Sequence, residues 1–180
     1  SFKMYMTYPA MMVGDRDMYW ALKELRHLGG ICGVHCENAG VIDGVIAEKK
    51  AAGLLGPSSH PESRPPYLEA EAVGRLLRIA QAADCPVVIV HLTNEEALKE
   101  VEHARRRGQK VYVETCPQYL LLDESVYYNP DYSQAARFVC APPIREKVNQ
   151  EALWRGLRRG EIQTISTDHC SFTLAQKDAG

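Results

Sequence analysis

The sequence lacks the features that would place it with membrane or nucleic-acid-binding proteins. Its longest apolar runs, such as residues 87–90 and 120–122, are far shorter than the roughly 20 residues that a membrane-spanning helix needs. The 21 basic and 23 acidic residues are spread through the chain and leave a net charge of -2. No charged patch therefore indicates nucleic acid or an anionic membrane as a partner, and a small or neutral substrate fits better.

Paired cysteines of the zinc-finger or thioredoxin kind are also missing. No Cys-x-x-Cys occurs, and most of the six cysteines lie in apolar runs: Cys32, Cys36, Cys85, Cys116, Cys140 and Cys170. Buried free thiols in a reducing cytoplasm are therefore expected. The sequence begins without an initiator Met or a signal segment, which we interpret as the start of a piece of a longer, cytoplasmic chain.

What the sequence does contain is an alternation of apolar runs and amphipathic helical patterns. Five strands are predicted, at residues 2–7, 30–35, 86–91, 110–115 and 162–167. Helices are predicted at 17–28, 68–83, 95–107 and 150–159, with excursion loops at 57–66 and 123–147. This order is typical of βα units around a parallel sheet, so the fold class is α/β. Five strands are fewer than the eight of a closed barrel.

Polar side chains stand in or just after four of these predicted strands, namely Lys3, His35, His91 and Asp168. Since the carboxyl ends of barrel strands build the active site, these side chains are expected at one mouth, as in a metallohydrolase. A single strand-end histidine is more often structural, and an Asp-His pair is often a helix cap, but the joint pattern favours a metal site. Three other histidines are expected to be exposed and without a role: His27, His60 and His103.

Six segments, in this order, resemble those of the hydantoinase and dihydropyrimidinase family, and the resemblance extends over essentially the whole chain. They are Ser-Phe-Lys-Met-Tyr-Met-Thr-Tyr (1–8), Val-His-Cys-Glu-Asn (34–38), Val-Ile-Val-His (88–91), Glu-Thr-Cys-Pro-Gln-Tyr-Leu (114–120), Ala-Pro-Pro-Ile-Arg (141–145) and Thr-Asp-His-Cys-Ser-Phe (167–172). The residues of these segments resemble bacterial D-hydantoinases more than eukaryotic dihydropyrimidinases. The resemblance implies that residues 1–180 are part of a TIM-type (β/α)8 barrel, approximately strands 4 to 8 with their helices.

The resemblance also implies a site with two divalent metal ions, most simply zinc. Lys3 would be carbamylated (N6-carboxylysine), which turns a cation into an anionic bridging ligand, and His35, His91 and Asp168 would be further ligands. A hydroxide bridging the metals would attack the amide carbonyl. Asp168 would take its proton as general base and deliver it to the departing nitrogen as general acid.

Substrate contacts are implied by the same resemblance. Tyr8 matches the family tyrosine that binds substrate and stabilises the oxyanion, although a packing aromatic is the simpler interpretation. Ala141 lies where the family holds the substrate's imide through backbone groups, and many members carry serine there. Tyr5, Met11 and Met12 lie where the family faces the exocyclic substituent, which favours a bulky apolar or aromatic group, although a Met-rich loop is also ordinary packing.

One expected motif is missing. The family takes two further ligands from a His-x-His pair on the first barrel strand, and the sequence contains no His-x-His. The loop that follows the last barrel strand is missing too. We therefore expect a fragment, without the first strands and the C-terminal region, that is inactive by itself.

The leading hypothesis is a cyclic amidase, a hydrolase of C–N bonds in cyclic amides, that converts hydantoins or dihydropyrimidines to N-carbamoyl amino acids. Allantoinases and dihydroorotases share the lysine and the histidines, so only Tyr8 favours a hydantoinase over them. Non-catalytic scaffolds of the collapsin-response type lack the metal ligands, and the presence of Lys3, His35, His91 and Asp168 argues against that alternative. Family likeness suggests a homotetramer or homodimer with a small-molecule substrate.

Overall fold

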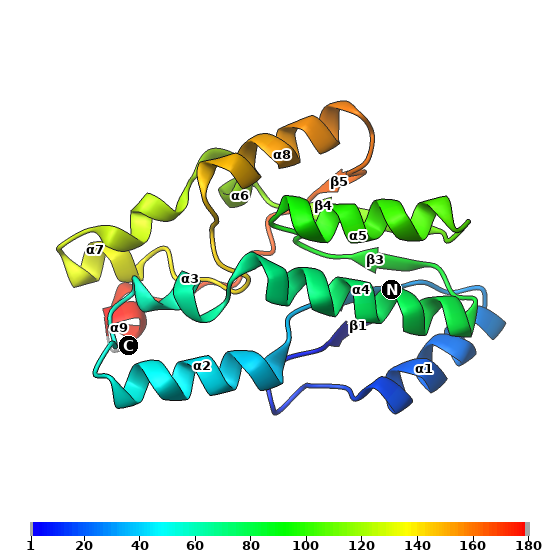
Figure 1. The fold of residues 1–180 in the computed structure, drawn as a ribbon, viewed down its shortest axis with the longest axis horizontal. Coiled ribbons are helices and arrows are strands. Elements are labelled where there is room, and N and C mark those ends of the chain that lie inside the picture. The colour runs from blue at the N-terminus through cyan, green and yellow to red at the C-terminus, as the bar shows by residue number, and fades with distance from the viewer. Residues whose placement is uncertain (1, 179–180) are drawn as a thin grey trace.

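The computed structural model describes residues 2–178 and has one parallel sheet of five strands in the order β1-β2-β3-β4-β5 (Figure 1). Each strand is hydrogen-bonded to the next one along the chain, and Tyr5 of β1 lies opposite His35 of β2. The strands are β1 (Phe2–Tyr5), β2 (Cys32–His35), β3 (Val87–Ile89), β4 (Val111–Thr115) and β5 (Thr164–Ile165). The predicted α/β class and parallel sheet are confirmed.

Every predicted strand is present but shorter than its apolar run. The third run was predicted to extend to His91, yet β3 ends at Ile89 because His91 takes a φ of 41°, which a strand does not allow. The fifth run covers six residues, of which only Thr164 and Ile165 pair with β4. The chain thus leaves the sheet early at the points where the candidate site residues follow.

The four predicted helices are present within a few residues as α1 (Asp15–His27), α4 (Pro66–Ala83), α5 (Glu95–Arg106) and α8 (Lys147–Arg158). Asn94 caps α5 as expected, since its side chain accepts a hydrogen bond from the backbone N–H of Ala97 at 2.9 Å. Figure 1 shows these four helices stacked one above another.

One long helix was not predicted. Helix α2 (Ala39–Ala51) buries only Ile42 completely, so it has no broad apolar stripe for periodicity to reveal. Both predicted loops contain short helical turns: the 57–66 loop holds α3, and the 123–147 loop holds η1 and α7, whose first turns are capped by Asp123 and Asp131. The short elements are α3 (Ser59–Ser63), α6 (Pro117–Leu121), η1 (Glu124–Tyr128), α7 (Tyr132–Ala136) and α9 (Leu174–Asp178).

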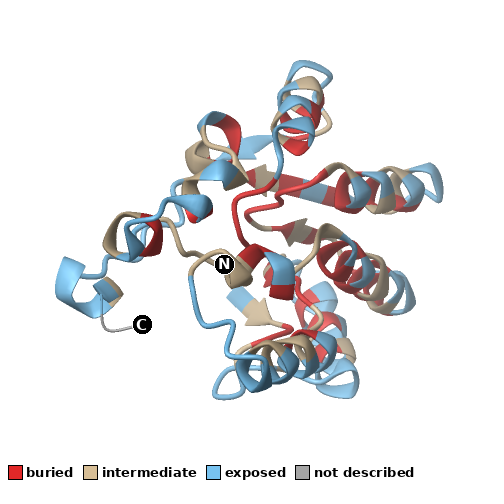
Figure 2. Cartoon of the chain, turned by 60° about the vertical axis from the view of Figure 1, so that its left-hand side comes forward, coloured by how far each residue is buried: buried red, intermediate tan, exposed pale blue. Residues whose placement is uncertain are grey.

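The hydrophobic core lies between the strands and the helices that cover their outer face. Leu22, Leu76 and Val101 from α1, α4 and α5 are fully buried in one cluster with Val34 and Ile89 of the sheet. Figure 2 shows the helices fanned around the strands with their buried sides turned inward. Each such leucine contributes about 1.5–3 kcal/mol by its removal from water. This packing holds the strand ends in fixed relative positions.

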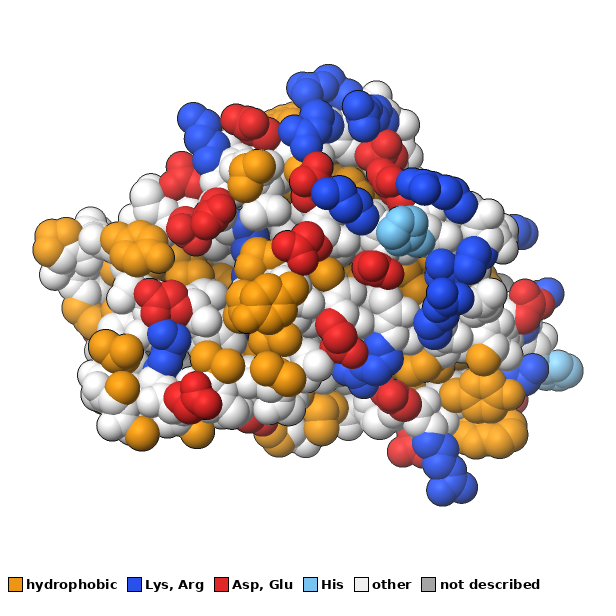
Figure 3. Space-filling view, viewed as in Figure 1, with side chains coloured by type: hydrophobic (Ala, Val, Ile, Leu, Met, Phe, Trp, Pro, Cys, Tyr) orange, Lys and Arg blue, Asp and Glu red, His pale blue; other side chains and the backbone are white. Residues whose placement is uncertain are grey.

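The surface charges are distributed as the composition predicts, with acidic and basic side chains intermixed over the face seen in Figure 3.

The cysteines agree only in part with the predicted buried free thiols. All six cysteines are free; Cys32, Cys36, Cys85 and Cys116 are buried as expected, but Cys140 is half-buried and Cys170 is exposed, because it follows the last strand. Within residues 2–178, no helix combines the length and apolar character that crossing a bilayer requires.

Candidate active site

Four predicted ligands come together where the strands end. Lys3 lies in β1, His35 is the last residue of β2, His91 follows β3 by two residues, and Asp168 follows β5 by three. Lys3 Nζ donates a hydrogen bond to Asp168 Oδ1 at 3.2 Å, across 165 residues of sequence. The rings of His35 and His91 meet edge to face with their centroids 4.5 Å apart. The sheet therefore brings these side chains to one end as two adjacent pairs.

His91 is buried, and neither ring nitrogen has a hydrogen-bond partner within residues 2–178. Burial, followed by the nearby His35, lowers the pKa of His91 to about 3, so its ring is neutral at neutral pH. Neutral imidazole is the form that binds metal ions. A buried polar group without a partner costs about 1–3 kcal/mol, which a bound ligand would remove. The unpartnered ring therefore fits a metal ligand.

His35 has a different environment. Its Nε2 lies 2.7 Å from Glu37 Oε2, and both side chains are almost fully buried. Burial by itself raises the pKa of Glu37, but the hydrogen bond from His35 and the positive charges of Arg64 and Arg145 lower it overall. The carboxylate is therefore ionised and accepts the Nε2 proton, which leaves Nδ1 of His35 free to act as a ligand.

The nitrogen and oxygen atoms of these side chains are of the kinds that bind zinc, but they do not form a complete set of metal ligands. No set of three or more His, Cys, Asp or Glu side chains among the described residues is arranged to hold a metal ion. Lys3 pairs with Asp168 as a cation, and both side chains are more than a third exposed to solvent. Lys3 would need to carry a carbamate to act as a ligand.

Tyr8 lies beside the histidines. Its ring centroid is 5.1 Å from that of His35 and 5.9 Å from that of Tyr5. Burial, followed by the negative charge of Glu37, raises the pKa of the Tyr8 hydroxyl well above its ordinary value. The hydroxyl is therefore protonated and able to donate a hydrogen bond at the site.

The backbone is strained at three of the predicted site residues. Among the described residues other than glycine, only Tyr8, Asp84, His91 and Asp168 have a positive φ, at 65°, 51°, 41° and 45°. Asp84 is the C-cap of α4, where a left-handed residue is ordinary. Such strain costs roughly 1–3 kcal/mol for each residue and is typical of functional sites.

The predicted substrate-contacting residues differ in their exposure to solvent. Met11 and Met12 are about half exposed, and their backbone N–H groups bond to the carbonyl of Tyr8 at 2.7 and 2.9 Å. They are therefore accessible in a tight turn of the described chain. Ala141 is half-buried and precedes the buried Pro142.

One histidine is less exposed than the sequence predicts. His60 is partly buried because α3 turns it inward, and its Nε2 donates to the carbonyl of Cys140 at 2.6 Å. Burial lowers the pKa of His60 to about 4. His27 and His103 are exposed, as predicted.

Several polar groups around the site are buried although no role was predicted for them, chiefly Glu37, Glu69 and Thr93. Glu69 is hidden in a helical pattern, where a carboxylate normally faces solvent. Glu37 and Arg145 had a visible signal, because they lie in the quoted Val-His-Cys-Glu-Asn and Ala-Pro-Pro-Ile-Arg segments.

Comparison with known proteins supports the resemblance. No model of a protein family matches the chain. The D-hydantoinase of Streptomyces coelicolor is 41% identical over 182 residues, and the D-phenylhydantoinase of Escherichia coli is 43% identical over 178 residues. These alignments cover 100% and 98% of this chain but only 39% and 38% of the relatives.

Solved structures give the same result. A D-hydantoinase from a Thermus species superposes with a TM-score of 0.94 at 34% identity, over 98% of this chain and 38% of that protein. The L-hydantoinase of Arthrobacter aurescens gives a TM-score of 0.88 at 28% identity, over 99% of this chain and 40% of that protein. The five-stranded sheet is therefore consistent with part of a TIM-type barrel. With 41–43% identity over essentially its whole length, the chain belongs to the hydantoinase and dihydropyrimidinase family, of which it spans one continuous segment.

Proposed function

We propose that the protein carrying this chain hydrolyses the cyclic amide bond of hydantoins or dihydropyrimidines to N-carbamoyl amino acids. The proposal depends on one observation: the two buried ring nitrogens of His91 have no hydrogen-bond partner within the described chain. The His91 ring stands 4.5 Å from the ring of His35, at the end of the sheet where Lys3 meets Asp168. Family membership supports the same reaction.

In this proposal His35, His91, Asp168 and a carbamylated Lys3 hold two divalent metal ions, most simply zinc. When bound, the metals supply hydroxide at neutral pH and polarise the amide carbonyl. The exposed carboxylate of Asp168 would take the proton of the attacking hydroxide and pass it to the departing ring nitrogen. The Tyr8 hydroxyl donates a hydrogen bond to the carbonyl oxygen as negative charge develops there.

The substrate's side group is proposed to be bulky and apolar or aromatic. The accessible apolar side chains of Met11 and Met12 support this choice, as does the name of the Escherichia coli relative, D-phenylhydantoinase. Backbone groups at Ala141 would hold the imide. By family likeness and the free cysteines, we further propose a cytoplasmic homotetramer or homodimer in which residues 1–180 are part of one barrel domain.

The test is metal content and ring opening by the complete natural protein that carries this chain, with hydantoin, 5-phenylhydantoin, dihydrouracil and allantoin as substrates. Lys3→Ala and Asp168→Ala should each abolish activity, while Lys99→Ala, at an exposed lysine of α5, should leave it unchanged. About two metals per chain with activity on hydantoins are expected. Activity on allantoin alone would instead favour an allantoinase, and an inactive, metal-free protein would favour a scaffold.

A further inference from the structure

A buried polar network joins two segments of the candidate site that are 52 residues apart in sequence. Its centre is the carboxylate of Glu69, in the first turn of α4, which is only 2% exposed. The carboxylate accepts from Thr93 N at 2.9 Å, Asn94 Nδ2 at 2.8 Å and Arg145 Nη2 at 2.9 Å, and also from the Thr93 hydroxyl. Four donors thus compensate the buried charge.

Arg145 uses all three nitrogens of its guanidinium group. Nη2 donates to Glu69, Nε donates to Thr93 Oγ1 at 2.9 Å, and Nη1 donates to the carbonyl oxygen of Arg64. The side chain is 5% exposed. A lysine would keep the charge but would have only one nitrogen, so it could not reproduce this fork.

The two ends of the network reach the two halves of the site. Thr93 follows His91 by two residues, in the turn after β3. Arg145 ends the 141–145 segment, whose backbone is fixed by two tyrosines: Tyr119 Oη donates to the Pro142 carbonyl at 2.8 Å, and Ile144 N donates to Tyr127 Oη at 2.9 Å. Arg145 then links this fixed segment to the turn after β3, through Thr93 and Glu69.

We propose that Arg145, held by Glu69 and Thr93, is a positioning residue that sets the His91 turn against the backbone of 141–142. The inference rests on the proposed function, because that backbone is where the substrate's imide would bind. Loosening the fork then misplaces the substrate without removing a metal ligand. The result is a higher KM and a lower kcat/KM with unchanged metal content.

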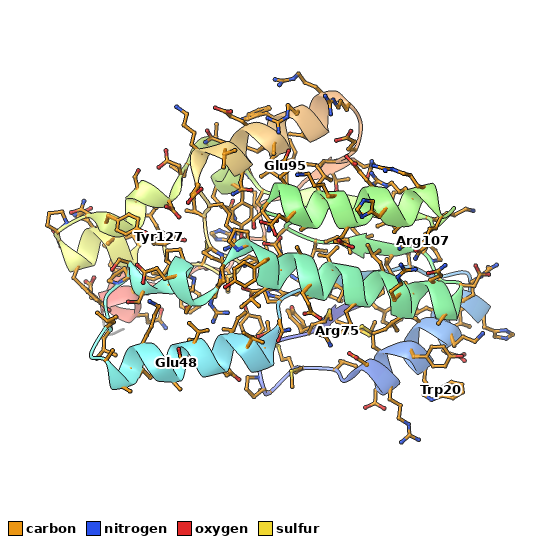
Figure 4. The ribbon with its side chains drawn as sticks, viewed as in Figure 1. Trp20, Glu48, Arg75, Glu95, Arg107 and Tyr127 are labelled. Carbon is orange, nitrogen blue, oxygen red and sulfur yellow. The ribbon has the colours of Figure 1, made fainter. Side chains whose placement is uncertain are left out.

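Arg105 offers a matched control at the other end of the strands. It lies in the last turn of α5, and all three of its guanidinium nitrogens also donate: to Val111 O at 3.0 Å, to Glu161 O at 2.7 Å and to Gln163 Oε1 at 2.8 Å. Figure 4 places its close neighbour in sequence, Arg107, and Tyr127 at opposite ends of the molecule. Arg105→Lys therefore removes a similar fork far from the candidate site.

The experiment compares Arg145→Lys with Arg105→Lys in the complete natural protein, by kinetics on 5-phenylhydantoin, metal content, Tm and amide exchange of residues 138–146. Arg145→Lys should lower kcat/KM about tenfold, mainly through KM, and speed exchange in that segment. Arg105→Lys should change kcat/KM less than twofold at a similar loss of Tm. Equal kinetic effects in the two variants, or an unchanged KM in Arg145→Lys, would overturn the inference. A wild-type protein inactive on every cyclic amide would instead refute the proposed function, and this inference with it.

Discussion

The rings of His35 and His91 lie 4.5 Å apart, yet only His35 has a buried carboxylate partner, Glu37 at 2.7 Å. The difference follows from position. Glu37 comes two residues after His35 on the same chain segment, whereas in the turn after β3 the buried carboxylate of Glu69 accepts from Thr93 and not from the ring of His91. His35 is thus oriented by the protein, and His91 is left open to a ligand.

Removing the partner of His35 should destabilise the fold. Glu37→Ala is expected to lower the free energy of unfolding by about 3 kcal/mol, because it leaves buried His35 and the nearby Arg64 without their acceptor. Denaturant unfolding measures this. Glu48→Ala, at an exposed position of α2 labelled in Figure 4, should change it by less than about 0.5 kcal/mol. Equal effects would show that the buried pair has no special role.

The unpartnered ring of His91 should lower the free energy of unfolding of the metal-free wild type relative to a variant with an apolar side chain at this position. His91→Leu is expected to raise its free energy of unfolding by about 1 kcal/mol, because an apolar side chain needs no hydrogen bond there. The same variant should lose the stabilisation that added zinc gives the wild type. Calorimetry with and without zinc measures both, with exposed His103→Leu as control. A metal-free His91→Leu protein that unfolds more easily would contradict this account.

His60 should make the stability depend on pH. Burial lowers its pKa from the ordinary value near 6.5 to about 4, so the folded state binds a proton less readily than the unfolded state. This contribution is complete above pH 6.5 and is lost as the pH falls to about 4. The loss should be about 2 kcal/mol, since the side chain is only partly buried.

The His60→Gln variant isolates that contribution, because other groups titrate in the same range. Its free energy of unfolding between pH 7 and pH 4 should fall less steeply than that of the wild type. His103→Gln, whose imidazole is exposed, should follow the wild-type slope. Parallel slopes for all three proteins would rule out His60 as the source.

Two helical glycines should respond in opposite directions to the same substitution. A Cβ at Gly44 of α2 meets nothing within 4 Å, so Gly44→Ala should stabilise by about 0.5–1 kcal/mol. A Cβ at Gly156 of α8 would lie 3.0 Å from both Ile162 Cδ1 and Leu98 Cδ2. Gly156→Ala should therefore lose that gain and destabilise by about 1 kcal/mol. Thermal unfolding of both variants checks the difference, and stabilisation by Gly156→Ala would show that the core is looser there.

Local sequence patterns were enough to predict the strands, the four amphipathic helices and the family. Apolar runs and helical periodicity are local patterns, and motifs such as Val-His-Cys-Glu-Asn are read without coordinates. The same patterns could not show α2, which lacks an apolar stripe, or the inward turn of His60, which depends on what packs over α3.

Which polar groups are buried, and which of them meet, depends on how the folded chain packs. Lys3 and Asp168 are 165 residues apart, and Glu69 and Arg145 are 76 residues apart, so no local pattern connects either pair. Their contacts exist because parallel strands packed under α4 and α5 end at one edge. Burial then gives Glu69 four donors and leaves the ring of His91 with none among the described residues, a difference that composition and spacing do not contain.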